Sequence, residues 1–222
     1  SLHRFPDGIE SEGFYQKRKP DGAPDWISTF RYYSESAGED IDYVVCSELP
    51  ALIWLANLAN IELNPTLSRI DDFDHPDFAV FDLDPFEPAG FEEARLVSLV
   101  IRDGLRSLGL KSQTKTSGAT GLQIFVPVER TYTFERTRSF VKNIGAMIES
   151  LMPDKVISKS LPIERRKGKV FIDPLQNSRS KTIVAAYSLR PLPGAPVSTP
   201  LSWKELESEV DSKSYNIHTI ME

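Results

Sequence analysis

The chain has 222 residues, a length that fits one large domain or two small ones, and its apolar and charged fractions are those of ordinary globular proteins. Its formal net charge of -6 argues against a general nucleic-acid coat protein, which would usually be basic. The lone cysteine, Cys46, cannot form an internal disulfide, and the longest charge-free apolar stretch, residues 49–61, is far shorter than the ~20 residues that span a bilayer. We therefore expect a cytoplasmic protein without a membrane partner, and by default a monomer.

The first half of the chain predicts two strands, a helix and a buried strand. Residues 26–33 and 42–46 have the aromatic and β-branched composition of strands. Ser47 is expected to cap a helix that runs to Asn60, since proline is tolerated in a first helical turn. Residues 78–83 form a largely apolar run, which is typical of a buried strand.

The second half alternates helices with strands. We expect helices at residues 91–108, 133–151 and 202–210, and strands at residues 111–116, 122–128, 170–173 and 183–186. Gly109 is a stop signal for the first of these helices, and Thr133 is a cap for the second. Because hairpin-like pairs accompany the alternation, the sequence predicts an α+β domain with a mixed or antiparallel β-sheet core flanked by helices.

Asp82 and Asp84 stand one residue apart at the carboxyl end of the strand predicted at residues 78–83. The two-residue period of a strand points both carboxylates to one face, while the intervening apolar residues point to the other. Two acids this close repel each other unless a cation lies between them, and such hard oxygen ligands suit Mg²⁺ or Mn²⁺. Asp173 also ends a short apolar strand and is the natural third ligand. The alternative is that Asp82 and Asp84 cap the next helix or line a solvated loop.

Acidic residues gather between Asp71 and Glu93, and basic residues between Lys155 and Arg190. A carboxylate-rich centre beside a basic segment suits a metal held next to a polyphosphate or a DNA backbone. Charge alone favours a simpler interpretation, in which these are two solvated faces of opposite sign.

Three further features are compatible with nucleotide or DNA binding. The turn at residues 117–121 offers backbone N–H groups and a hydroxyl to an anion, although a plain hairpin with two glycines is the simpler explanation. Lys181 and Arg190 could hold phosphates, and singly each is an ordinary surface charge. Phe14 and Tyr15 could stack on a base, although aromatic pairs near a turn more often belong to a small core.

Many short segments, in order along nearly the whole chain, resemble one family. The resemblance is carried by residues 4–8, 14–17, 25–26, 72–85, 115–122, 169–173, 176–177, 181–182, 187–188 and 193–201. The family is the polymerase domain of bacterial and archaeal DNA ligase D, a branch of the archaeo-eukaryotic primase-polymerase superfamily. The resemblance implies a single catalytic domain over residues 1–222 that lacks the family's N-terminal ~40 residues.

The activity implied is that of a DNA-directed nucleotidyltransferase using two-metal chemistry with Mn²⁺ or Mg²⁺. Such an enzyme adds nucleotides, ribonucleotides in particular, to primer 3′ ends during gap filling in non-homologous end joining. Its partners would be broken or gapped DNA, NTP or dNTP, Ku, and a DNA ligase that is fused or separate. A nucleoid-associated location follows from the DNA substrate.

The site residues that the resemblance implies fall into three groups. The catalytic and metal-binding residues are Asp82, Asp84 and Asp173. The nucleotide-binding residues are Asn64, Ser117, Gly118, Thr120, Gln123, Gln176, Lys181 and Arg190. The residues that contact DNA or a base are Phe14, Tyr15 and Lys17.

The chain departs from the family's pattern at several of these positions. Histidine is usual where Asn64 and Gln123 stand, a lysine is expected near His3, and Thr120 is lysine in some members. Each lost charge-assisted hydrogen bond would weaken nucleotide binding roughly 10–100-fold. Because both amides still donate hydrogen bonds, partial activity is expected.

Two other functions are alternatives to the polymerase. A haloacid-dehalogenase-type phosphatase also carries two such aspartates, but it requires Thr or Val where Phe86 stands and places the motif near the N-terminus. The second alternative is a weakened or inactive primase-fold module that binds DNA ends or a Ku-type partner. The substituted histidines favour this module, whereas the three aspartates, Lys181 and Arg190 oppose it.

Overall fold

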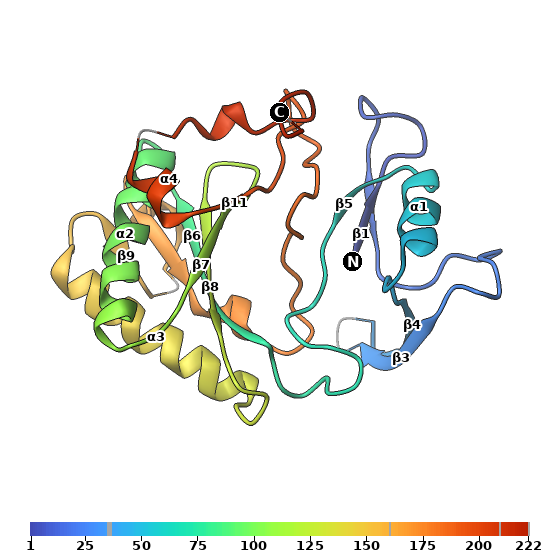
Figure 1. Cartoon of the computed structure of the whole chain (residues 1–222), viewed down its shortest axis with the longest axis horizontal. Helices are drawn as coiled ribbons and strands as arrows, with labels where there is room; N and C mark the ends of the chain where they lie inside the picture. Colours follow the sequence, from blue (N-terminus) through green and yellow to red (C-terminus); the bar gives the residue numbers. More distant parts are fainter. Residues whose placement is uncertain (35–36, 160, 209, 222) are drawn as a thin grey trace. The chain divides into compact units, whose positions relative to one another are not determined.

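The computed structural model describes residues 1–34, 37–159, 161–208 and 210–221. The chain forms two compact units, Ser1–Pro65 and Thr66–Glu222, and each is described by itself (Figure 1). Within the described ranges, no helix combines the length and the apolar character needed to cross a bilayer.

The first unit contains a small sheet, a hairpin and one helix. Strands β2 (Phe14–Gln16), β1 (Leu2–Arg4) and β5 (Asn60–Leu63) form an antiparallel sheet in that order. Strands β3 (Thr29–Ser34) and β4 (Glu39–Val44) form the hairpin. Helix α1 (Leu49–Asn57) follows, with proline in its first turn as expected.

The bounds of α1 differ from the prediction. Its N-cap is Glu48 rather than Ser47, and no side chain caps it. The helix ends before Asn60 because Ala59 takes a positive φ of 55° and turns the chain into β5. Asn60 therefore belongs to a strand, which sheet pairing with β1 stabilises and local sequence did not indicate.

The second unit is built on a six-stranded mixed sheet, which confirms the predicted fold class. Its order is β11 (Pro200–Leu201), β7 (Gln113–Thr116), β8 (Leu122–Pro127), β6 (Phe78–Pro85), β10 (Val170–Asp173) and β9 (Val156–Ile157). The β10–β9 pair is parallel and the other pairs are antiparallel.

Helices α2 (Phe91–Ser107) and α3 (Phe134–Leu151) pack on one face of this sheet (Figure 1). The α2 helix is followed by Gly109 at a φ of +74°, and α3 begins after Thr133, whose hydroxyl accepts a hydrogen bond from Arg136 N–H; both ends were predicted. A short helix α4 (Trp203–Glu207), capped by Ser202, ends earlier than expected. The described residues also form three 3-10 turns, η1 (Ile163–Arg165), η2 (Pro174–Asn177) and η3 (Ser212–Ser214).

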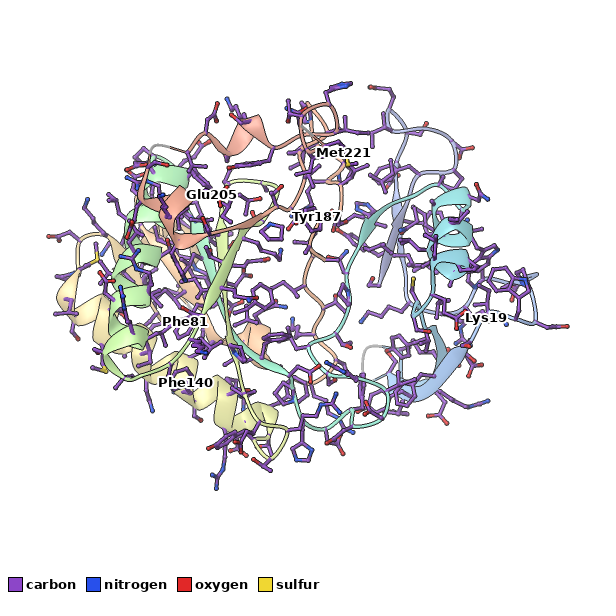
Figure 2. The ribbon with its side chains drawn as sticks, in the orientation of Figure 1. Lys19, Phe81, Phe140, Tyr187, Glu205 and Met221 are labelled. Carbon is purple, nitrogen blue, oxygen red and sulfur yellow. The ribbon has the colours of Figure 1, made fainter. Side chains whose placement is uncertain are left out.

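The core lies between the sheet and these helices. It contains alternate residues of each central strand, including Phe81 and Leu83, both fully buried. The ring of Phe81 meets Phe140 of α3 edge-on, with centroids 6.0 Å apart (Figure 2). This packing turns the intervening residues of β6 to the opposite face of the sheet.

The strand expected at residues 183–186 does not form. Ile183 and Val184 are buried as its apolar character suggested, and Ile183 packs against Val80 and Phe134. The backbone pairs only through an isolated bridge between Thr182 and Thr66. The apolar run predicted a strand because its side chains are buried, but burial alone does not provide a neighbouring strand with which the backbone can pair.

Candidate active site

A row of four polar side chains crosses the sheet of the second unit. Lys115 lies opposite Gln123, Gln123 opposite Asp82, and Asp82 opposite Asp173, on strands β7, β8, β6 and β10. Residues directly opposite each other on neighbouring strands project to the same face. Asp84 shares this face because it stands two residues further along β6. The row therefore lies on the face away from α2 and α3.

The carboxyl groups of Asp82 and Asp84 are destabilised as anions. Burial raises the pKa of Asp82 to about 7, and the neighbouring charges of Asp84 and Asp173 act in the same direction. The hydrogen bond from Gln123 Nε2 to Asp82 Oδ1, 3.0 Å long, opposes the shift. Burial of its carboxyl group, followed by the charge of Asp173, raises the pKa of Asp84, although much of that residue is exposed.

Lys115 brings a cation to the other end of the row. Its side chain is almost buried, and Nζ lies 2.5 Å from both Gln123 Oε1 and Ser198 Oγ. Burial lowers the pKa of Lys115 to about 7, while Asp82 acts to raise it and Arg190 to lower it further. The row therefore carries a buried cation at β7 and carboxyl groups at β6 and β10, with one amide between them.

The turn at residues 117–121 is organised by Ser117. The Ser117 hydroxyl oxygen accepts hydrogen bonds from the N–H groups of Ala119 and Gly121, each 3.1 Å long. The Arg190 guanidinium donates to the Ser117 carbonyl at 2.6 Å. Two of the N–H groups proposed for an anion are thus directed at Ser117, while Thr120 is exposed at the tip of the turn.

Two glycines allow this turn to approach its neighbours. Gly118 has a φ of +70°, and a Cβ there would lie 2.7 Å from Arg190 Cγ. A Cβ at Gly121 would lie 2.3 Å from the carbonyl oxygen of Leu83, between Asp82 and Asp84. The turn therefore packs directly on the segment of β6 that carries the two acids.

The segment after β10 is tied back to the sheet by an amide. Asn177 is 1% exposed; its Oδ1 accepts from Val80 N–H and its Nδ2 donates to Val80 C=O, both at 2.7 Å. Gln176 donates to the carbonyl of Thr182 at 2.9 Å. Asp173 Oδ1 accepts from the N–H of Leu175 at 2.9 Å, and Lys181 is exposed.

The aromatic residues predicted to contact DNA belong to the first unit. Phe14 and Tyr15 are 45% and 63% exposed on β2. The Arg4 guanidinium lies 5.3 Å from the Phe14 ring centroid, and the Tyr15 ring stacks on His3 at 4.0 Å. Lys17 follows β2 and is half-buried. These rings are surface groups rather than members of a small core.

Asn64 also belongs to the first unit, directly after β5. Its Nδ2 donates to Oε1 of Glu62 at 2.9 Å, and Glu62 is 3% exposed. The other Glu62 oxygen lies 4.0 Å from His3 Nδ1. The Asn64 amide is thus oriented by a buried carboxylate within its own unit.

The three aspartates have the donor chemistry of a magnesium or manganese site, but they are not gathered around one point. Across the ranges that the structure describes, no group of three or more His, Cys, Asp or Glu side chains could hold a metal ion as arranged. Asp82 and Asp173 each direct one oxygen to an N–H donor of the chain. The raised pKa values of Asp82 and Asp84 nevertheless reflect burial first and repulsion from neighbouring acids second. The residues fit a hard cation that would draw the carboxylates together.

Comparison with known proteins identifies the family to which the chain belongs. The chain matches the family described as "LigD, primase-polymerase domain" over residues 1–222, and it belongs to that family. A solved structure described as the polymerase domain from Mycobacterium tuberculosis ligase D in complex with DNA matches with a TM-score of 0.85 and 29% identity, covering 93% of this chain and 74% of that one. The resemblance seen in the sequence is thereby confirmed.

Two curated relatives are similar over almost the whole chain. The bifunctional non-homologous end joining protein LigD of Bacillus subtilis is 32% identical, covering 99% of this chain and 35% of its own length. The multifunctional non-homologous end joining protein LigD of Pseudomonas aeruginosa is 33% identical, covering 99% of this chain and 26% of its own length. The chain thus spans about a third or less of these relatives.

Sequence reasoning assigned no role to three residues of this site: Lys115, Asn177 and Ser198. All three stood in the family-like segments, but nothing local distinguished them. The alternation of side chains along β7 predicts that Lys115 points to the face opposite Thr114 and Thr116. Its hydrogen-bond partners, however, depend on the order of the strands in the sheet. Ser198 lies 83 residues from Lys115 in sequence and was found only through the fold.

Proposed function

We propose that this chain is a DNA-directed nucleotidyltransferase that adds nucleotides, ribonucleotides in particular, to primer 3′ ends at gaps during non-homologous end joining. The two units would act as one catalytic domain, because the family match spans both. Gapped or broken DNA, NTP or dNTP, Ku and a DNA ligase are its proposed partners. The relatives' names and the DNA complex of the similar structure support this proposal.

The observation that carries the proposal is the polar row on the face of the sheet that carries Asp82. Asp82, Asp84 and Asp173 stand on adjacent strands with oxygen donors only, and the pKa values of Asp82 and Asp84 are raised by burial and by acidic neighbours. A structural role accounts for one oxygen of Asp173, which caps η2 by accepting from Leu175 N–H, but it gives no reason for two acids close together on β6. A site that awaits a divalent cation accounts for their mutual repulsion better.

We assign the metal to Asp82, Asp84 and Asp173. When bound, Mn²⁺ or Mg²⁺ would favour ionisation of the primer 3′-hydroxyl and neutralise charge on the departing pyrophosphate. Gln123 holds one oxygen of Asp82 and leaves the other free for the cation. Burial of the row beneath a nucleotide would strengthen each of these electrostatic contacts.

The triphosphate is assigned to the turn and to the basic segment that follows Asp173. Arg190 is already oriented by the Ser117 carbonyl and presents a planar set of donors that suits phosphate oxygens. The proposed nucleotide contacts are Asn64, Ser117, Gly118, Thr120, Gln123, Gln176, Lys181 and Arg190. The exposed rings of Phe14 and Tyr15, with Lys17, are proposed to contact a base and the DNA backbone.

Primer extension tests the proposal. On gapped DNA with a 5′-phosphate, ribonucleotides and Mn²⁺ should support extension, and Asp84→Ala or Asp82→Ala should reduce it at least ~1000-fold because transition-state charge is no longer neutralised. Asp154→Ala removes an exposed aspartate of the second unit and should extend normally. Extension that survives Asp84→Ala would refute the assignment of the site.

A second candidate is a primase-fold module that binds DNA ends or a Ku-type partner with little or no polymerase activity. It is favoured by the amides at Asn64 and Gln123, which lack the cationic form of an imidazole, and by the absence of an assembled metal cluster among the described side chains. Retained DNA binding without extension by the unmodified protein would select this candidate. Histidine at both positions should then restore extension if the amides are the cause.

A further inference from the structure

Lys115 is a buried cation that reaches the candidate site through Gln123. It is 5% exposed and projects from β7 to the face that carries Gln123 and Asp82. Its Nζ lies 2.5 Å from Gln123 Oε1, 2.5 Å from Ser198 Oγ and 3.4 Å from the Thr116 carbonyl. Gln123 donates in turn from Nε2 to Asp82 Oδ1 at 3.0 Å. The amide therefore bridges a buried ammonium and a carboxylate.

In their charged forms, Lys115 and Asp82 permit one orientation of the amide. An ammonium offers only donors and a carboxylate only acceptors, whereas a primary amide has one donor end and one acceptor end. With Oε1 toward Lys115 and Nε2 toward Asp82, both contacts are satisfied. A flipped amide would set NH₂ against the ammonium and its carbonyl oxygen against the carboxylate, which is costly where water is excluded. Lys115 and Asp82 thus fix the Gln123 amide from its two ends, Lys115 through Oε1 and Asp82 through Nε2.

Lys115 is itself held in place from a distant segment. Ser198 Oγ accepts from Lys115 Nζ and donates to the Thr116 carbonyl at 2.8 Å. The ammonium is consequently fixed between Gln123 and Ser198 rather than free to swing toward solvent. Because Ser198 holds the Lys115 ammonium in place, the ammonium can in turn hold the Gln123 amide in one orientation.

We propose that Lys115 is a positioning residue of this site. It orients the Gln123 amide, which holds one oxygen of Asp82 and leaves the second oxygen for a divalent cation. Groups that orient metal ligands in this way typically change metal affinity about 10–100-fold when they are removed. The role toward the metal rests on the proposed function, whereas the orientation of the amide does not.

The orientation is tested first in the unmodified, metal-free protein by NMR. The Gln123 side-chain amide protons should exchange with solvent at least ~10-fold more slowly than those of Gln113, which is exposed on β7. Lys115→Met should reduce this difference, and Lys142→Met, at an exposed position of α3, should leave it unchanged. Gln123→Met identifies the signal by removing it. Equal exchange at the two glutamines of the unmodified protein would overturn the proposal, with no Lys115 variant required.

Mn²⁺ affinity then tests the role toward the metal. Loss of the Lys115 charge should strengthen cation binding, whereas loss of the amide's orientation should weaken it. A double-mutant cycle with Gln123→Met separates the two effects, because the charge effect occurs in both backgrounds and the orientation effect needs Gln123. We expect Lys115→Met to weaken Mn²⁺ binding about 10-fold more in the native background than in Gln123→Met.

Thermal unfolding of each variant shows that it is folded before Mn²⁺ is titrated. An effect of Lys115→Met that is the same in both backgrounds would overturn the positioning role. A native protein that binds no Mn²⁺, with its Gln123 amide still protected, would refute the proposed metal site and with it the role of Lys115 toward the metal. The two failures are distinguishable because amide exchange is measured without metal.

Discussion

At the scale of single residues, folding changes the ionisation of Asp82. In the unfolded chain this carboxyl group has an ordinary pKa, whereas burial and two acidic neighbours raise the folded-state pKa to about 7. An acidic group whose pKa is raised by folding destabilises the folded state at any pH at which the unfolded chain carries that group ionised. The site therefore carries a cost in stability that a bound cation would relieve, which is a common property of catalytic centres.

Replacing Asp82 with Asn should stabilise the metal-free protein, and more at pH 8 than at pH 5. The folded pKa lies above the unfolded value of 3.8, so the unfolded chain releases this proton first and native stability falls as pH rises from about 4 to about 7. Asn cannot ionise, so its advantage in unfolding free energy should grow between pH 5 and pH 8 by on the order of 2–3 kcal/mol. Urea unfolding of both proteins in EDTA at pH 5 and pH 8 measures this difference in unfolding free energy.

The exposed Asp154→Asn variant controls for the general loss of a negative charge. It should change stability little at either pH. If Asp82→Asn gave the same gain at pH 5 and pH 8, Asp82 would not hold a raised pKa, and the electrostatic description of the site would be wrong.

At the scale of elements, the site depends on the close approach of the 117–121 turn to β6. The turn and the strand meet backbone to backbone, since Gly121 leaves no room for a side chain above the Leu83 carbonyl. The Asn177 amide fixes the other end of the same strand by pairing with both backbone groups of Val80. One contact thus lies within the acid-bearing segment, at Leu83, and the other lies just before it, at Val80.

Gly121→Ala should destabilise the protein by about 1–3 kcal/mol, because its Cβ would lie 2.3 Å from a backbone oxygen that cannot move without shifting β6. Gly104→Ala is the matched control. Gly104 lies inside α2 with no atom within 4 Å of a new Cβ, so alanine should stabilise the helix by about 0.5–1 kcal/mol. Urea unfolding of both variants measures the two effects, and effects of the same sign would contradict the close approach.

At the scale of the whole molecule, the two units differ in the core that each can bury. The larger hydrophobic cluster is formed by residues of the second unit, from Ala79 to Leu206. The buried apolar residues of the first unit are fewer: Leu2, Phe5, Ile27, Ile41, Ala51 and Leu55. A unit of that size with so small a core is marginally stable without support.

A fragment of residues 66–222 should therefore fold by itself and unfold cooperatively in urea, since its core is internal. A fragment of residues 1–65 should show no cooperative transition. Far-ultraviolet circular dichroism and amide dispersion in NMR spectra measure both. A 66–222 fragment with no transition would show that its stability depends on the first unit, contrary to this expectation.

The sequence by itself determined the features that depend on neighbours along the chain. The period of residues 78–83 predicted that Asp82 and Asp84 share a face, and Phe81 and Leu83 are indeed in the core. Thr133 and Gly109 predicted helix ends because caps and positive φ angles are local properties. Family membership was also readable, since its motifs are short and lie in order.

Only the tertiary structure decided which residues meet across strands. The end of α1, the irregular segment at residues 183–186 and the row from Lys115 through Gln123 to Asp173 all depend on pairing between distant segments. Strand order and register are set by burial of the whole sheet, and no single segment encodes them. For that reason the acids were visible in the sequence, whereas the buried lysine that orients the amide beside them was not.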